Sequence, residues 1–126
     1  MARKKSLYGG FAVGSGKQQK PPAPRRYDYE NMLCAAIKDR LIVEVQYDGD
    51  TYRRRYEPYI VYRSATAKIL SYGVVLADAN FGQELGPHNF EVGLIRDLRL
   101  TSDHFQPPPI FDRSRDAYKG GILCSI

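Results

Sequence analysis

The feature that most restricts the fold of this chain is a series of short segments in which apolar and polar residues alternate. The clearest is residues 41–47, where every second residue is apolar and the residues between them include Glu44 and Gln46. A period of two residues is typical of a strand with one buried face. Residues 48–50, Asp-Gly-Asp, have the composition of a tight turn. The pattern therefore predicts an antiparallel hairpin over residues 41–57.

Further strands are expected after this hairpin. The strand should break or bend at Pro58, which cannot donate a hydrogen bond to a strand ladder, and continue over residues 59–62. Residues 69–77 are apolar on both faces, which predicts the most buried strand. A last strand region is expected over residues 90–100, with a bulge near Gly93.

A single helix is expected before the strands. Asp28 has the residue type of a helix N-cap, and Leu33, Ala36 and Ile37 follow at helical spacing up to about Arg40. One helix and about five short antiparallel strands predict a mainly β fold, a small closed or nearly closed barrel, because closure removes exposed strand edges.

Charge and proline content divide the chain into three parts. Residues 1–26 hold seven basic residues and no acidic one, together with glycines and prolines, and are expected to form a disordered basic tail. The 12 other basic residues lie with all 14 acidic residues in 27–126, which is close to neutral. Residues 27–106 form the predicted domain. A second tail, 107–126, begins with three prolines, and its apolar run 122–124 is expected to dock on the barrel or on another subunit.

Length and cysteine content restrict the class of protein. A chain of 126 residues suits one domain. Its longest uncharged apolar stretch, residues 69–77, is far too short to span a membrane, so no membrane partner is expected. The N-terminus lacks the apolar segment of a secretory signal. Cys34 and Cys124 are expected to be reduced thiols in a cytoplasmic protein.

The order of these motifs resembles the WYL domain family over residues 33–105. The family's pattern has a helix with an Ala-Ile pair, a strand ending in Tyr, an Arg-x-hydrophobic-x-Pro element, a later hydrophobic strand and a final Phe. These positions fall here on Ala36, Ile37, Tyr47, Arg54, Tyr56, Pro58, Phe90, Ile95 and Phe105. The resemblance implies an SH3-like barrel of the Sm type, preceded by a helix and flanked here by disordered or extended tails.

The sequence departs from the family at several polar positions. The name-giving Trp and Tyr fall on Lys68 and Ile69, and the family's Asp-Arg pair falls on Gly93 and Leu94. WYL domains usually follow a winged helix-turn-helix in bacterial transcription regulators, where they are thought to sense a ligand, often a nucleic acid or a nucleotide. No pair of DNA-reading helices fits residues 1–26, so the resemblance implies a standalone copy.

Candidate ligand-binding residues gather around an arginine cluster. Arg54 matches the family position and offers a guanidinium to a phosphate or carboxylate, while its neighbours point to the opposite face of a strand. Tyrosines can stack on bases, and His88 falls near a basic position of the family. The candidates are Arg53, Arg54, Arg55, Tyr47, Tyr72 and His88. The structural alternative is that Arg54 pairs with Glu44 or Asp97 and that the tyrosines cap a small core.

The sequence contains no enzyme signature and no set of residues at metal-ligand spacing, so neither catalysis, a cofactor nor a metal is expected. The leading hypothesis is a non-catalytic regulatory or ligand-binding module that recognises an anionic ligand, such as single-stranded nucleic acid or a nucleotide. The alternative is a protein-interaction module whose tails order on a partner or in a homo-oligomer.

Overall fold

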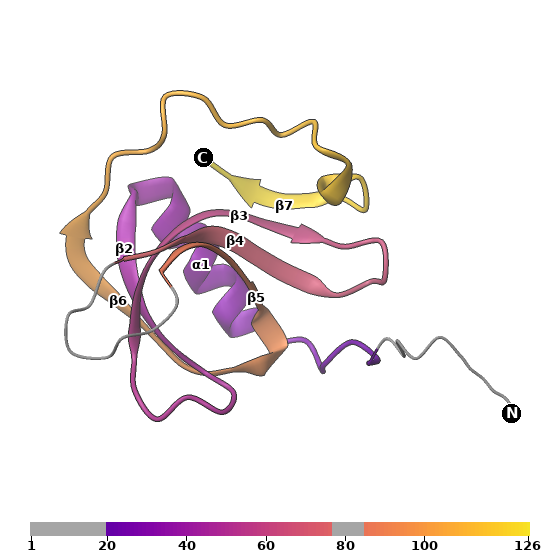
Figure 1. The fold of residues 1–126 in the computed structure, drawn as a ribbon, viewed down its shortest axis with the longest axis horizontal. Helices are drawn as coiled ribbons and strands as arrows, with labels where there is room; N and C mark the ends of the chain where they lie inside the picture. Colours follow the sequence, from indigo (N-terminus) through magenta and orange to yellow (C-terminus); the bar gives the residue numbers. More distant parts are fainter. Residues whose placement is uncertain (1–19, 77–84) are drawn as a thin grey trace, which may run out of the picture.

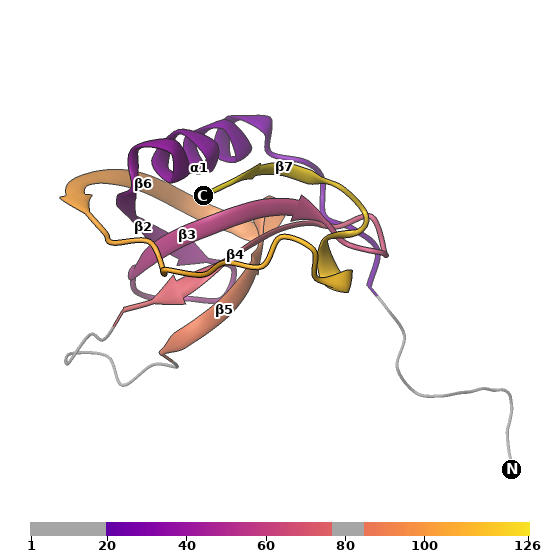
Figure 2. The ribbon, with the colours of Figure 1, turned by 90° about the horizontal axis from the view of Figure 1, so that it is seen from above.

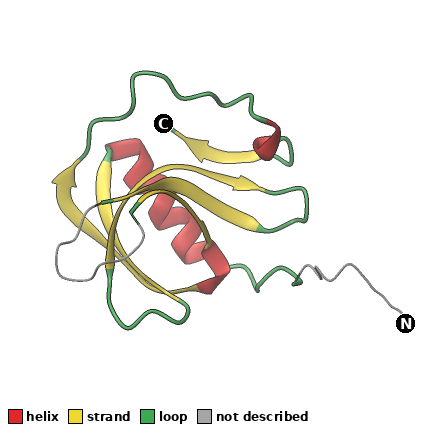
Figure 3. Cartoon of the chain, viewed as in Figure 1, coloured by secondary structure: helices red, strands yellow, loops and turns green. Residues whose placement is uncertain are grey.

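A computed structural model of the chain describes residues 20–76 and 85–126 (Figure 1). One helix precedes a series of strands, and Figure 3 shows that loops and short turns connect them. The elements are α1 (Tyr27–Asp39), β2 (Leu41–Tyr47), β3 (Arg54–Arg63), β4 (Ile69–Val75), β5 (Gly86–Glu91), the 3-10 helix η1 (Val92–Leu94), β6 (Ile95–His104), the 3-10 helix η2 (Asp116–Tyr118) and β7 (Ile122–Ser125). The expectation of a disordered tail falls, for residues 1–19, outside the described residues.

The strands form one antiparallel sheet in the order β5-β4-β3-β2-β6, and β7 pairs with β3. The predicted mainly β class is therefore confirmed, but the predicted closed barrel is not, because in the described residues the sheet is open. Its terminal strands β5 and β6 are joined through η1 without pairing to each other. The bulge expected near Gly93 is this 3-10 turn.

The predicted hairpin over residues 41–57 is confirmed by the pairing of β2 with β3, in which Val43 lies opposite Tyr56. Gly49 has a φ of 86°, a conformation that favours glycine, in the turn between them. The strand bends near Pro58 as expected, because the pairing of β3 with β4 shifts register between Pro58 and Ile60.

Helix α1 buries Leu33, Ala36 and Ile37 in the main core. It begins near Asp28 and ends near Arg40 as predicted, but the predicted N-cap residue was wrong. Arg26 occupies the N-cap position without a capping side-chain bond, and Asp28 lies in the first turn, where its carboxylate pairs with Arg26. In the two described ranges no helix is long and apolar enough to cross a membrane.

The most continuously buried strand is β3 rather than the predicted 69–77 segment. Strand β4 alternates between buried and half-buried residues, whereas β3 has an unbroken buried run from Pro58 to Tyr62. The reason is that β3 is covered on both faces. In Figure 2, α1 lies on one side of β3 and the segment 107–118, here called the C-terminal strap, runs along the other. Ile60, Tyr62 and Tyr118 form a second small core under the strap.

The C-terminal residues that were expected to form a tail thus carry η2 and β7, and β7 docks on strand β3 of the same chain. Cys124 of β7 forms a disulfide with Cys34 of α1, across 90 residues of sequence. The expectation of two reduced thiols is therefore wrong. Cysteine spacing alone cannot show that α1 and β7 lie side by side. The cytoplasmic assignment rested on reduced thiols, and the disulfide removes that argument.

Candidate functional site

The arginine cluster at the start of β3, Arg53, Arg54 and Arg55, is neutralised by acidic residues. Arg53 donates from Nε and Nη2 to Asp97, and Arg55 donates from Nη2 to Asp103 at 2.8 Å; both acids lie on β6. Arg54 points the other way and donates from Nε and Nη2 to Asp50, each at 3.1 Å. Arg54 therefore pairs with an acidic residue, as the structural alternative expected, but the partner is Asp50 and not Glu44 or Asp97.

The pair formed by Arg54 and Asp50 is largely buried, with side-chain exposures of 13% and 10%. One nitrogen of Arg54, Nη1, is buried and has no hydrogen-bond partner among the described residues. The guanidinium carbon lies 5.8 Å from the ring centre of Tyr52 and 5.9 Å from that of Phe90. Because Asp50 cancels its charge, this site offers a single donor rather than a free cation.

Tyr47 and His88 join Arg54 around Phe90. Their ring centres lie 5.1 Å and 4.5 Å from that of Phe90. The Tyr47 hydroxyl accepts a hydrogen bond from the Glu91 amide at 3.0 Å, and burial raises the pKa of this phenol. The structure thus brings three predicted residues, Tyr47, Arg54 and His88, to one place. It puts Arg53 and Arg55 beside β6.

Tyr72 lies elsewhere, in a cavity of about 250 Å³ under the C-terminal strap, here called the Tyr72 pocket. The strap supplies Phe111 and Tyr118, whose rings stack with centres 6.1 Å apart, and Tyr59 meets Phe111 edge to face at 6.1 Å. Four aromatic side chains therefore line one cavity, and Arg115 and Asp112 of the strap complete its charged lining.

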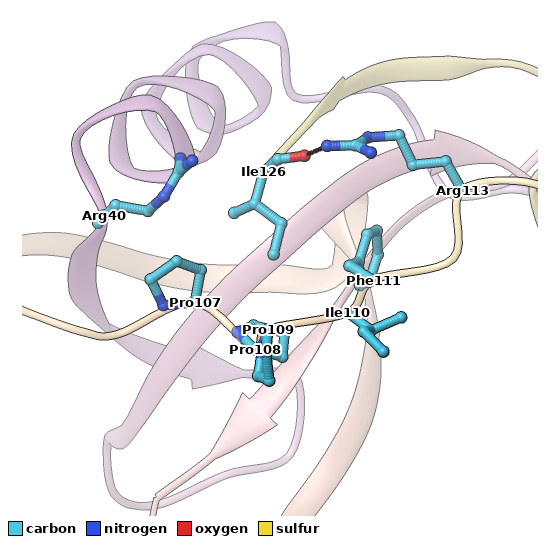
Figure 4. Close-up of a pocket in the computed structure, with 8 residues that line it drawn as sticks. All are labelled: Arg40, Pro107, Pro108, Pro109, Ile110, Phe111, Arg113 and Ile126. Atoms are coloured by element: carbon cyan, nitrogen blue, oxygen red, sulfur yellow. Dashed lines mark hydrogen bonds between the residues drawn. The ribbon is translucent and has the colours of Figure 1, made fainter.

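A larger cavity of about 430 Å³ adjoins the Tyr72 pocket and shares three of its lining residues, Pro108, Ile110 and Phe111. We call it the Arg40 pocket. Figure 4 shows Arg40 reaching in from the end of α1 and Arg113 from the strap, on opposite sides of Ile126. Among the described residues, these arginines are the only charged side chains that line this cavity. Its other walls are Pro107, Pro108, Pro109, Ile110, Phe111 and Ile126.

Hydrogen bonds to main-chain and hydroxyl oxygens hold both arginines of the Arg40 pocket. Arg40 donates from Nη1 to the Ile37 carbonyl, and Arg113 donates from Nε to Ser125 Oγ at 2.8 Å and from Nη2 to the main-chain oxygen of Ile126. Each guanidinium is oriented by these bonds and keeps further N–H groups for a ligand.

The arginines that line the two pockets differ in ion pairing from the arginines predicted as the site. Within residues 20–76 and 85–126, carboxylate side chains pair with Arg25, Arg26, Arg53, Arg54, Arg55, Arg96 and Arg99. The arginines of the same ranges without such a partner are Arg40, Arg63, Arg113 and Arg115, and all but Arg63 line the two pockets. Three of the four arginines without a carboxylate partner in these ranges therefore lie at the two cavities beside the strap.

Local charge also affects the strap. Ser114 donates its amide and hydroxyl to Asp112, and with Arg115 nearby these bonds hold the pKa of Asp112 below its usual range, so the carboxyl is ionised at neutral pH. Burial raises the pKa of Tyr118, and the charge of Arg115 opposes that rise. The described residues contain no group of three or more His, Cys, Asp or Glu side chains that could hold a metal ion.

Sequence reasoning missed the strap because Pro107, Pro108 and Pro109 indicate an end of regular structure. The available signal was the order of aromatic and basic residues in the following segment, Phe111, Arg113, Arg115 and Tyr118, which is unusual for a solvated tail. Comparisons with protein-family models, with curated proteins and with solved structures gave no match to this chain.

Proposed function

We propose that this protein is a non-catalytic binding module for an anionic ligand with flat aromatic groups, a nucleotide or a segment of single-stranded nucleic acid, at the C-terminal strap. The observation that carries the proposal is the gathering of Arg40, Arg113 and Arg115 beside an aromatic cavity, where none of them forms an ion pair with a carboxylate side chain of residues 20–76 or 85–126. Aromatic platforms next to cationic side chains are the means by which proteins bind unpaired bases and their phosphates.

Each pocket suits a different part of such a ligand. The Tyr72 pocket, at about 250 Å³, has room for one base against Tyr72, Phe111 and Tyr118. Stacking of a base on an aromatic side chain contributes about 1–3 kcal/mol. Arg115 at the same cavity and Arg113 and Arg40 in the next one supply guanidinium groups for phosphate oxygens. A flexible strand can reach both because the cavities share Phe111 as a wall.

We propose in addition that the fold is a divergent WYL-like, SH3-like barrel. The support is the strand order β5-β4-β3-β2-β6 with a 3-10 turn between β5 and β6, preceded by a helix. In this proposal Arg54, which falls on the family's Arg position, contributes one hydrogen bond from Nη1 to a ligand, and the strap is an addition to the family's pattern.

The test is binding of a fluorescently labelled oligodeoxythymidylate of about ten nucleotides, followed by anisotropy. Arg115→Gln should weaken binding about tenfold, since a charge-assisted hydrogen bond contributes about 1.4 kcal/mol or more. The matched control is Arg99→Gln, which removes the same charge from β6, where Arg99 pairs with Asp97. Equal losses in both variants would mean that only net charge matters, and the proposed site would be wrong.

A protein-interaction module is the second candidate, favoured by the apolar residues that the strap and β7 leave exposed. Ile110 is 86% exposed, and Ile122 and Leu123 are about 40% exposed. Light scattering distinguishes the two: a stable dimer that loses its association on Ile110→Ser and binds no oligonucleotide would support this candidate instead.

A further inference from the structure

We propose that the disulfide between Cys34 and Cys124 is a redox control of the strap pockets: oxidised, it fixes the strap over the sheet, and reduction by a dithiol loosens the strap and weakens ligand binding. This inference rests on the proposed function for its binding readout, but its structural part, the loosening of the strap, is independent of any ligand. The observations concern how the strap is anchored at its two ends.

One end of the strap follows β6 and Phe105, which is buried in the main core and whose amide bonds to the Arg40 carbonyl at 2.8 Å. The other end passes through η2 into β7, and β7 is held by a short ladder. Its register pairs with β3 are Ile60 with Ser125, Val61 with Cys124 and Tyr62 with Ile122, with a shift within them. The disulfide is the covalent link between this end and α1.

The pockets depend on the position of β7. Ile126 forms a wall of the Arg40 pocket, and both hydrogen bonds that orient Arg113 go to Ser125 and Ile126. The strap itself supplies Phe111 and Tyr118 to the Tyr72 pocket. If β7 moves away from β3, the Arg113 guanidinium loses its position and the Arg40 pocket loses the wall formed by Ile126. The Tyr72 pocket loses Phe111 and Tyr118 if the strap moves with β7.

The rest of the molecule does not depend on β7 in this way. Strands β2, β3, β4, β5 and β6 pair with one another, and α1 buries Leu33, Ala36 and Ile37 among them. Breaking the disulfide is therefore expected to affect residues 107–126 first. Local opening of a weakly held segment, with the core intact, is common in proteins whose elements differ in contact density.

Both cysteines are partly buried and pack against the main core, so the proposal requires that a dithiol reach one of the two sulfurs. A thiolate of the dithiol attacks one sulfur, the Cys34–Cys124 bond breaks, and a mixed disulfide forms. The second thiolate then attacks the mixed disulfide and closes a disulfide in the reagent. Two electrons pass from the dithiol to the protein, and the two cysteine sulfurs take up the two protons that the dithiol releases.

Amide hydrogen exchange of the ligand-free full chain, oxidised and reduced by dithiothreitol, tests the structural part. Reduction should accelerate exchange in residues 107–126 by about tenfold or more and leave β2 and β4 unchanged. The double variant Cys34→Ser, Cys124→Ser should exchange fast in residues 107–126 under both conditions, which controls for effects of the reagent. Unchanged exchange on reduction, or faster exchange throughout the sheet, would overturn the proposal.

Anisotropy with the labelled oligodeoxythymidylate tests the functional part: reduction should weaken binding by about tenfold, and the double variant should show the weak affinity with or without dithiothreitol. Binding that is equally tight in oxidised and reduced protein overturns the redox control while the proposed function stands. If reduction frees the strap and neither form binds the oligonucleotide, the proposed function is wrong and so is control of its ligand by the disulfide.

Discussion

At the scale of the residue, Arg40 combines a backbone and a side-chain role. It ends α1 with a φ of 59°, and its amide donates to the Ala36 and Ile37 carbonyls, while its guanidinium lines the Arg40 pocket. A left-handed conformation costs a residue other than glycine about 1 kcal/mol. The left-handed backbone at this position therefore favours glycine, whereas the proposed binding of an anion requires arginine.

This conflict gives a matched pair of variants. Arg40→Gly removes the guanidinium and should leave the free energy of unfolding unchanged or raise it by up to about 1 kcal/mol, because glycine is the favoured residue of a left-handed helix end. Arg40→Ala removes the same guanidinium without that gain. Both should bind the oligodeoxythymidylate several-fold more weakly, as urea unfolding and anisotropy would measure. Wild-type affinity in both variants would exclude Arg40 from the binding site.

At the scale of the element, the ion pair of Arg53 with Asp97 connects the loop before β3 to β6, and β2 lies between these two strands in the sheet. Hydrogen bonds from Arg53 hold the pKa of Asp97 below its usual range. A carboxyl whose pKa is lower in the folded than in the unfolded chain stabilises the fold above its unfolded pKa, and this contribution is lost as the pH falls through the folded pKa. The pair is about one-third exposed, so its contribution is small.

Accordingly, Arg53→Gln should lower the free energy of unfolding at pH 7 by less than about 1 kcal/mol. The difference from the wild type should shrink as the pH falls below about 3.9, the ordinary aspartate value, and disappear once Asp97 is protonated in both states. Denaturant unfolding at pH 7 and at acidic pH measures this. A difference that does not depend on pH would show that packing of the Arg53 side chain, and not its charge, is responsible.

The arrangement of elements around β3 shows what the sequence could and could not predict. The hairpin of β2 and β3 was predicted because alternating residues and the turn at Gly49 are local signals. The double coverage of β3 was not, because it depends on residues about 60 positions away in the chain. Among the predicted site residues, Tyr47, Arg54 and His88 do meet, yet their position beside Asp50 and Phe90 changes what Arg54 can bind.

At the scale of the whole molecule, most of the excess positive charge belongs to residues 1–19, which are not among the described residues. Residues 1–19 contain four basic residues, Arg3, Lys4, Lys5 and Lys17, and no acid. The segment that follows contacts the body. The Ala23 amide donates to Glu91 at 2.8 Å, and Arg25 pairs with Glu30. Pro24 passes so close to Gly93 that any Cβ there would collide with its carbonyl.

A truncated chain of residues 20–126 should therefore keep its fold and its binding site while losing a sequence-independent attraction for phosphates. The slope of log affinity for the oligodeoxythymidylate against log salt should fall by up to about 0.7 for each of the four missing charges. Anisotropy at several salt concentrations measures both slopes. Complete loss of binding in the truncated chain would show that residues 1–19 contain the binding site. If the affinity of the full chain does not depend on salt, the proposed electrostatic contribution is wrong.

The sequence by itself predicted α1 and the hairpin of β2 and β3, since alternation, turn residues and helical spacing act between near neighbours. It also placed the excess charge, because charge is a property of composition. Only the tertiary structure decided which arginines are neutralised, that Cys34 and Cys124 meet, and that the segment after three prolines returns to cover β3. These are pairings between distant residues, and no local pattern encodes which partner a long side chain or a distant strand will reach.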